Sequence, residues 1–165
     1  MRTSHDELID GFDIGRFSSA PTKFNVEDLV PLSHRVIASL DSSAVDPQLE
    51  EAGVPTSLRP AYWNAVRGNV ASRAEAGSWW RVFSEGARPA VPEEDRAFVD
   101  EALGHLGDPP YDDTTWSTWT ASVKEATGRK GKALFMPLRL AVTGEPRGPE
   151  MAEVMPLLQR KPSLG

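Results

Sequence analysis

The 165-residue chain contains no cysteine and only three histidines. The first absence excludes disulfides, thiolate metal sites and cysteine nucleophiles, and it fits a reducing cytoplasm as the location. No two of His5, His34 and His105 form a His-x-x-x-His pair, so we expect no metal site. No motif in the sequence indicates a cofactor, and the order of serine, histidine and aspartate residues along the chain does not support a Ser-His-Asp catalytic site.

Long apolar runs and regular alternation are missing as well. No segment approaches the ~18 consecutive apolar residues of a membrane-spanning helix, and residues 1–14 are too acidic for a signal peptide. We therefore expect no membrane partner. No segment alternates apolar and polar residues with the period of two that a half-buried strand requires. Strands are not expected.

Apolar residues instead recur at helical spacing, which predicts an all-α fold of about eight short helices in two packed helical subdomains. A soft boundary at 85–92 separates the two halves. Pro31 interrupts the first apolar stripe, so that helix is either kinked there or begins there. The expected helical segments are 26–40, 47–53, 60–70, 76–83, 92–106, 112–126, 136–144 and 148–158.

Two pairs of tryptophans follow the same helical spacing. Tryptophans at such positions belong to a core more often than to a platform on which bases stack. We predict that at least one residue of each pair is buried. The pairs are Trp79 with Trp80, and Trp116 with Trp119.

Charge is distributed unevenly around a formal net charge of −6, which argues against non-specific coating of nucleic acid. Residues 85–113 hold nine acidic and two basic side chains, whereas residues 124–147 hold six basic and two acidic ones. Glu93, Glu94 and Asp95 are expected to complement a helix dipole rather than to act as paired catalytic carboxylates.

The basic stretch centres on residues 128–132, Gly-Arg-Lys-Gly-Lys. Lysine and arginine neutralise phosphate, and glycine lets a backbone approach it closely, so one interpretation is a phosphate contact. The other interpretation is a solvated connector between two helices. A Walker A loop is excluded, because no strand precedes the segment, the spacing differs and Ala133 follows the lysine.

This loop opens a longer pattern. Residues 127–144 read TGRKGKALFMPLRLAVTG, and Gly-Pro-Glu follows at 148–150. The stretch resembles the C-terminal signature of bacterial glutamyl-tRNA synthetases. Further segments, some of them similar to the α-proteobacterial branch, extend the resemblance over roughly residues 6–158; they are 12–24, 63–69, 79–80 and 112–124.

The resemblance implies an α-helical anticodon-binding region with subdomains at 25–86 and 87–165, preceded at 1–24 by a remnant of the stem-contact connecting segment. The family's ATP-binding motifs, His-x-Gly-His and Lys-Met-Ser-Lys-Ser, are absent. No catalytic residue is therefore expected, and the chain is either a synthetase fragment or a truncated paralogue.

The implied partner is tRNA, with tRNA-Glu as the expected species. In this interpretation phosphate contacts position the tRNA and side chains in a helical cleft read unstacked bases. A loose alignment places Asn69 where discriminating members of the family carry a base-reading arginine. The candidate tRNA-binding residues are Arg129, Lys130, Lys132, Arg67, Asn69 and Arg73.

An alternative stays open: a free-standing paralogue that docks on a synthetase or another protein without binding RNA. The net acidic charge favours it, as do departures from the family pattern at Phe24-Asn25, Pro31 and Ser33. Arg139 has two interpretations of its own. It belongs either to the basic patch or to a helix junction whose carbonyls it hydrogen-bonds.

Overall fold

The computed structural model describes residues 9–10, 12–16, 29–88 and 90–164. Within these residues every regular element is a helix, which confirms the all-α prediction. Among the described residues the α-helices are numbered α2 to α9, which confirms the expected number of about eight helices. Most of the predicted connecting segment, 1–24, and the Phe24-Asn25 departure lie outside the described residues.

The first half is built from short helices joined by 3-10 turns. Its α-helices are α2 (Val30–Ala38), α3 (Asp46–Glu51), α4 (Arg59–Val66) and α5 (Trp80–Glu85). Four 3-10 turns accompany them: η3 (Ser42–Val45), η4 (Thr56–Leu58), η5 (Arg67–Asn69) and η6 (Arg73–Glu75). A further turn, η1, covers Ile14–Arg16.

Two predicted boundaries in this half shift for local reasons. Helix α2 has Pro31 in its first turn, where a missing N–H costs nothing, so Pro31 marks the start of the helix and not a kink. The helix expected from Ala76 begins only at Trp80. Gly77, which precedes it, lies so close to Ala52 that a Cβ there would fall 2.3 Å from the Ala52 Cβ. The close packing of Gly77 against Ala52, at the end of α3, therefore constrains the backbone just before α5.

The second half has longer helices. They are α6 (Glu93–Gly104), α7 (Thr115–Thr127), α8 (Lys132–Thr143) and the short α9 (Met151–Val154), which continues into η7 (Met155–Leu157). One prediction here is wrong. The helix expected to start at Met136 starts at Lys132 and carries Pro137 in its interior.

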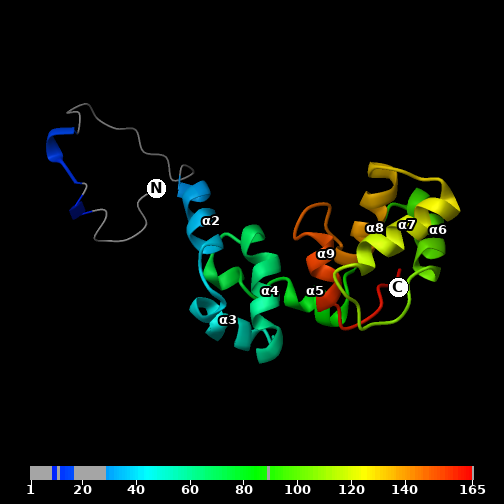
Figure 1. The fold of residues 1–165 in the computed structure, drawn as a ribbon, viewed down its shortest axis with the longest axis horizontal. Coiled ribbons are helices and arrows are strands. Elements are labelled where there is room, and N and C mark those ends of the chain that lie inside the picture. Colours follow the sequence, from blue (N-terminus) through cyan, green and yellow to red (C-terminus); the bar gives the residue numbers. More distant parts are fainter. Residues whose placement is uncertain (1–8, 11, 17–28, 89, 165) are drawn as a thin grey trace.

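The two halves share one core. Figure 1 shows α2, α3 and α4 on one side, α6, α7 and α8 on the other, and α5 and α9 between them. Buried apolar residues of both halves form one cluster, in which Trp63, Phe83 and Leu138 are almost fully enclosed. The backbone N–H of Gln159 donates to the Phe83 carbonyl at 2.9 Å. The expectation that the halves pack together is confirmed.

The paired tryptophans divide as predicted. Trp80 and Trp119 are buried, with 6% and 2% of their surface exposed, whereas Trp79 and Trp116 are half-buried. None of the helices in the described residues has both the length and the hydrophobicity needed to cross a membrane.

Candidate nucleic-acid interface

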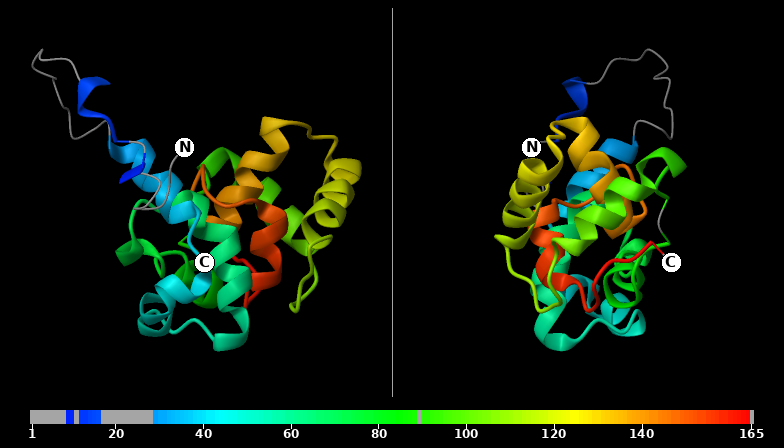
Figure 2. Two further views of the ribbon diagram at one scale, coloured as in Figure 1. Left: turned by 60° about the vertical axis from the view of Figure 1, so that its left-hand side comes forward. Right: turned by 90° about the vertical axis from the view of Figure 1, so that its right-hand side faces the viewer.

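The basic loop connects α7 to α8 at the outer edge of the second half. Both views in Figure 2 place this yellow-to-gold connection at the periphery of the molecule. Gly128 ends α7 in the left-handed conformation, with φ 71°, and its N–H donates to the Lys124 carbonyl at 2.9 Å. Gly131 precedes α8 with φ 54° and ψ −138°. Both backbone bends lie at positive φ, which favours glycine.

As a candidate phosphate contact, Arg129 would be expected to have a free charged end, and the structure shows otherwise. Its Nη1 forms an ion pair with the Asp95 carboxylate on α6 and lies 3.2 Å from the Ala133 carbonyl oxygen. Its guanidinium carbon lies 3.9 Å from the centre of the Phe98 ring. The side chain therefore has three protein partners. The expectation failed because no sequence pattern relates this loop to α6.

Lys130 and Lys132 are placed as expected for a phosphate contact. Both are exposed. Within the described residues, neither side chain has an ion pair or a hydrogen bond. Two positive charges are thus available to solvent at the start of α8, where they can neutralise phosphate groups without first breaking a protein contact.

Arg139 supports the junction between α8 and α9. Its guanidinium donates to the Pro149 carbonyl at 2.7 and 3.0 Å and to the Gly148 carbonyl at 2.8 Å. Burial lowers the pKa of Arg139, and the nearby Glu150 carboxylate opposes that shift. The structural interpretation of this residue is confirmed.

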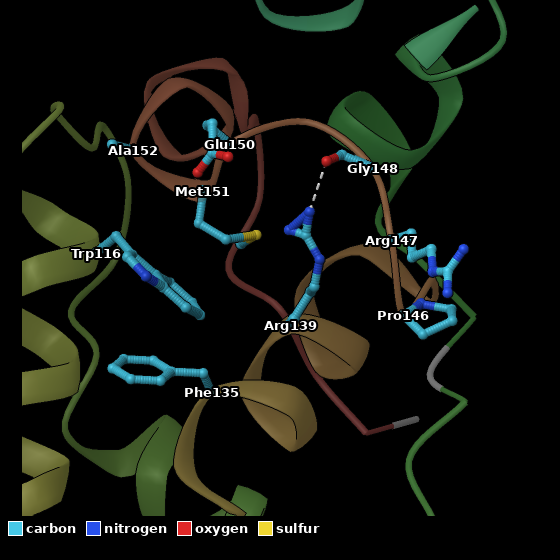
Figure 3. Close-up of a pocket in the computed structure, with 9 residues that line it drawn as sticks. All are labelled: Trp116, Phe135, Arg139, Pro146, Arg147, Gly148, Glu150, Met151 and Ala152. Atoms are coloured by element: carbon cyan, nitrogen blue, oxygen red, sulfur yellow. Dashed lines mark hydrogen bonds between the residues drawn. The ribbon is translucent and has the colours of Figure 1, made fainter. Parts of the chain in front are cut away.

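An open pocket of about 470 Å³ lies beside this junction. Figure 3 shows Trp116 and Phe135 along one side of it and the Arg139 guanidinium directed at the turn that carries Gly148. The Trp116 and Phe135 ring centres are 6.4 Å apart with a 36° tilt, and Phe135 is 45% exposed. Arg147, also exposed, lines the opposite wall. Exposed aromatic faces beside cations are surfaces on which unpaired bases stack.

The other candidate residues lie in the first half. Arg67 and Asn69 belong to η5, which contacts α2, and Arg73 belongs to η6, which contacts α3. Asn69 and Arg73 are exposed and Arg67 is half-buried. Among the described residues, the side chains of Arg67 and Arg73 form no hydrogen bond and no ion pair. The structure therefore leaves these three side chains on a different part of the surface from the basic loop.

Sequence reasoning did not identify three parts of this site: Asp95, Phe135 and the pocket wall formed by Trp116. One available signal was the spacing of Ala133 and Pro137, because a proline leaves the carbonyl four residues earlier without its helical partner. A nearby cation that binds that oxygen can then be sought. The contacts with Asp95 and Phe98 depend on the tertiary fold and have no such signal.

The arrangement suits recognition more than bond-making. Lysines can contact phosphates and the aromatic pocket can hold a base. In the residues that the structure describes, no cluster of three or more histidine, aspartate or glutamate side chains could hold a metal ion.

Comparison with known proteins gives consistent matches. Residues 83–165 match the family model described as "Anticodon binding domain". The chain is 55% identical over 161 residues to glutamate–tRNA ligase 2 of Jannaschia sp. (strain CCS1), which covers 98% of this chain and 36% of the ligase. It is 51% identical over 156 residues to glutamate–tRNA ligase 1 of Cereibacter sphaeroides, covering 94% and 35%. The chain thus spans little more than a third of the curated relatives it matches.

Among solved structures, the glutamate-tRNA synthetase from Elizabethkingia anophelis matches with a TM-score of 0.69. The match covers 94% of this chain and 33% of that one, at 18% identity. At this identity the match establishes the similarity of the fold alone.

Proposed function

This chain belongs to the anticodon binding domain family, and from that premise we propose that it binds the anticodon region of a tRNA, with tRNA-Glu as the partner. In this proposal the chain recognises tRNA and catalyses no reaction. The relatives are named glutamate–tRNA ligases, and we propose that the ligase activity needs regions of those proteins that this chain, at about a third of their length, does not match. The cytoplasm is the location that this role implies.

The observation that carries the proposal is the face of α8 between the basic loop and the pocket. Lys132, Phe135 and Arg139 are spaced three and four residues apart, so they lie along one side of the helix. The exposed lysine and the exposed ring are therefore one helical turn apart. A charged contact for a phosphate next to an aromatic surface for a base fits a single-stranded RNA loop.

The first-half residues have a proposed part as well. Arg67, Asn69 and Arg73 offer hydrogen-bond donors to a base edge, and Asn69 also offers an acceptor. The exposure of Asn69 and Arg73 supports this role, as does the lack of side-chain partners for the two arginines among the described residues. Because they lie apart from the basic loop, they would contact a different part of the tRNA.

A titration with tRNA-Glu and an unrelated tRNA at several salt concentrations tests the proposal. Changing Lys130 and Lys132 together to alanine should weaken both complexes alike, because phosphate contacts carry no sequence information. The log–log salt slope should flatten by roughly one to two, since each phosphate contact contributes about 0.7–0.9. Arg129 is left out of this variant because its charge is already paired.

A matched control removes two cations elsewhere. Arg81 and Arg96 are exposed and pair with carboxylates of their own helices, at 3.0 and 3.7 Å. Their double alanine variant has the same net charge as the lysine variant. If it weakens tRNA binding equally, overall charge and not the basic loop is responsible. If the parent chain does not bind tRNA even at low salt, the proposed function is wrong.

A second candidate function is docking on a protein. Helix α2 and the residue before it expose Leu29, Val30, Leu32 and Val36, each with 41–53% of its surface accessible. Such an apolar surface is typical of a protein contact. Two results together would favour this function. The parent chain would bind no tRNA in the titration, and it would bind a protein through a contact that the Val36→Asp substitution abolishes.

A further inference from the structure

We propose that Arg129 is a positioning residue of the basic loop and makes no phosphate contact itself. Its guanidinium holds the loop against α6 and the first turn of α8, so that Lys130 and Lys132 face the tRNA. The inference rests on the proposed function. It assigns to Arg129, a candidate RNA-binding residue, the role of ordering Lys130 and Lys132 instead.

The first argument comes from Pro137. In a regular helix the N–H of residue 137 donates to the carbonyl of residue 133, but proline has no N–H. The Ala133 carbonyl thus lacks this partner in the first turn of α8. Arg129 Nη1 lies 3.2 Å from that oxygen and supplies a donor from outside the helix. This contact also explains why α8 continues through Pro137 instead of starting there.

The second argument comes from the surroundings of the guanidinium. Asp95 neutralises its charge, and the two side chains are only 32% and 23% exposed. Phe98 lies beneath it at 3.9 Å. A planar guanidinium can contact a carboxylate, a carbonyl and a ring at once, whereas the ammonium of a lysine cannot replace that geometry.

The third argument is that little else restrains the loop. A Cβ placed on Gly128 or Gly131 would meet no atom within 4 Å, so both bends lie in open space. Among the described residues, the hydrogen bonds of the loop backbone are all local: the Gly128 N–H donates to the Lys124 carbonyl, the Arg129 N–H donates to the Thr127 hydroxyl at 3.3 Å, and the Gly131 carbonyl accepts from the first turn of α8. The Arg129 side chain therefore connects the loop to α6, and the two lysines follow it one and three positions later.

Replacing Asp95 by asparagine tests the inference by the sign of its effect. Removing an acidic charge next to a phosphate-binding loop strengthens RNA binding if electrostatics alone decide. If Asp95 holds Arg129, the variant should instead bind tRNA about five- to tenfold more weakly, because a disordered loop must be ordered on binding. Glu94→Gln is the matched control, since Glu94 is an exposed acid on the same turn and has no ion pair among the described residues. It should bind at least as tightly as the parent.

Arg129→Lys provides a second test that keeps the charge. A phosphate contact would survive this change with a similar affinity and salt slope, whereas a positioning residue would fail about as badly as in Asp95→Asn. Tighter or unchanged binding in Asp95→Asn, or parent-like binding in Arg129→Lys, would overturn the inference.

Hydrogen exchange without RNA separates this inference from the proposed function. The N–H groups of Leu134 and Phe135 donate to the Gly131 carbonyl at 3.1 and 3.0 Å, so they report on the start of α8. They should exchange severalfold faster in Asp95→Asn and Arg129→Lys than in the parent and in Glu94→Gln. Parent-like exchange overturns the positioning role of Arg129 whatever the tRNA result. A parent chain that binds no tRNA removes the proposed function, and the exchange rates then still decide whether Arg129 orders the loop.

Discussion

The two halves of the molecule fix their backbones with the same kinds of side chain. In the first half, Trp63 is 1% exposed and its ring N–H donates to the Leu40 carbonyl at 2.7 Å. In the second half, Trp119 is 2% exposed and donates to the Ala102 carbonyl, also at 2.7 Å. Each half thus buries one tryptophan that joins two separate segments through a satisfied polar atom.

The arginines show the difference. Arg59 in the first half donates once to a carbonyl, that of Val54 at 3.2 Å, while Arg139 in the second half donates to two carbonyls at once. The turn held by Arg139 packs on the other half, since a Cβ on Gly148 would fall 2.5 Å from the Trp79 ring. In the second half, therefore, Arg129 and Arg139 bind backbone carbonyls, whereas Lys130 and Lys132 have no side-chain partner among the described residues.

Truncating the two buried tryptophans is the most severe way to break the comparison. Trp63→Ala and Trp119→Ala should each lower the free energy of unfolding by about 3–5 kcal/mol, because each leaves a large cavity and an unpaired carbonyl. Urea unfolding followed by circular dichroism measures both. Trp116→Ala, at a half-buried position, should have a smaller effect. A parent-like free energy of unfolding for either Trp63→Ala or Trp119→Ala would show that the two tryptophans do not stabilise their halves in the same way.

Arg139→Gln tests whether the arginine of the second half is structural. We expect a loss of about 2–3 kcal/mol, since the Gly148 and Pro149 carbonyls lose a charged donor at a half-buried position. Arg73→Gln in the first half should stay within about 0.5 kcal/mol of the parent, as expected for an exposed side chain that has no partner among the described residues. Equal stabilities in chemical denaturation would remove the distinction between the two halves.

The sequence was sufficient for the fold class because apolar spacing and helix-ending glycines are local signals. Gly128 and Gly144 both end helices in the left-handed conformation, close to the predicted helix ends at 126 and 144. The start of α8 was missed because Pro137 was taken as a first-turn residue. Inside the helix Pro137 cannot donate to the Ala133 carbonyl, and the Arg129 side chain, 3.2 Å from that oxygen, approaches it from outside α8.

The candidate site was only partly predictable. The exposure of Lys130 and Lys132 agrees with both interpretations of the basic loop, and Gly128 and Gly131 both have positive φ. The pairing of Arg129 with Asp95 joins residues 34 positions apart, and no periodicity encodes such a contact. Whether any of the six candidate residues contacts RNA stays a prediction.

Glycine replacements sharpen the comparison at the backbone level. Gly131→Ala forces a side chain into a conformation with φ 54° and should lower stability by about 1–2 kcal/mol. Gly68→Ala is the matched change in the first half. Gly68 lies in η5 without a positive φ and has no atom near its Cβ position, so the effect should be close to zero or slightly stabilising. Thermal unfolding compares them, and a neutral Gly131→Ala would mean that the loop relaxes freely.

The chain's two tyrosines, one in each half, should change stability only in alkali. Tyr62 donates to the Ala76 carbonyl at 2.9 Å and Tyr111 to the Gly107 carbonyl at 2.8 Å. Burial raises the pKa of Tyr62 well above its ordinary 10.0, against smaller opposing effects of backbone hydrogen bonds. Burial, helped by the Asp108 charge, raises the pKa of Tyr111 to about 12.

Both shifts have the same sign, so both tyrosines should make stability fall in alkali. A pKa that is higher in the folded chain means that the unfolded chain loses its proton first, so the contribution is complete below pH 10.0. For Tyr111 it is lost as the pH rises from 10.0 to about 12. Urea unfolding between about pH 9 and 12 should therefore show a decline that Tyr62→Phe flattens more than Tyr111→Phe, because Tyr62 is fully enclosed and Tyr111 is partly solvated. The lysines and arginines are identical in both variants, so they do not affect the comparison. Tyrosinate absorbance of Tyr62→Phe then reports Tyr111 alone, and an ordinary pKa of 10.0 there would confine the effect of burial to the first half.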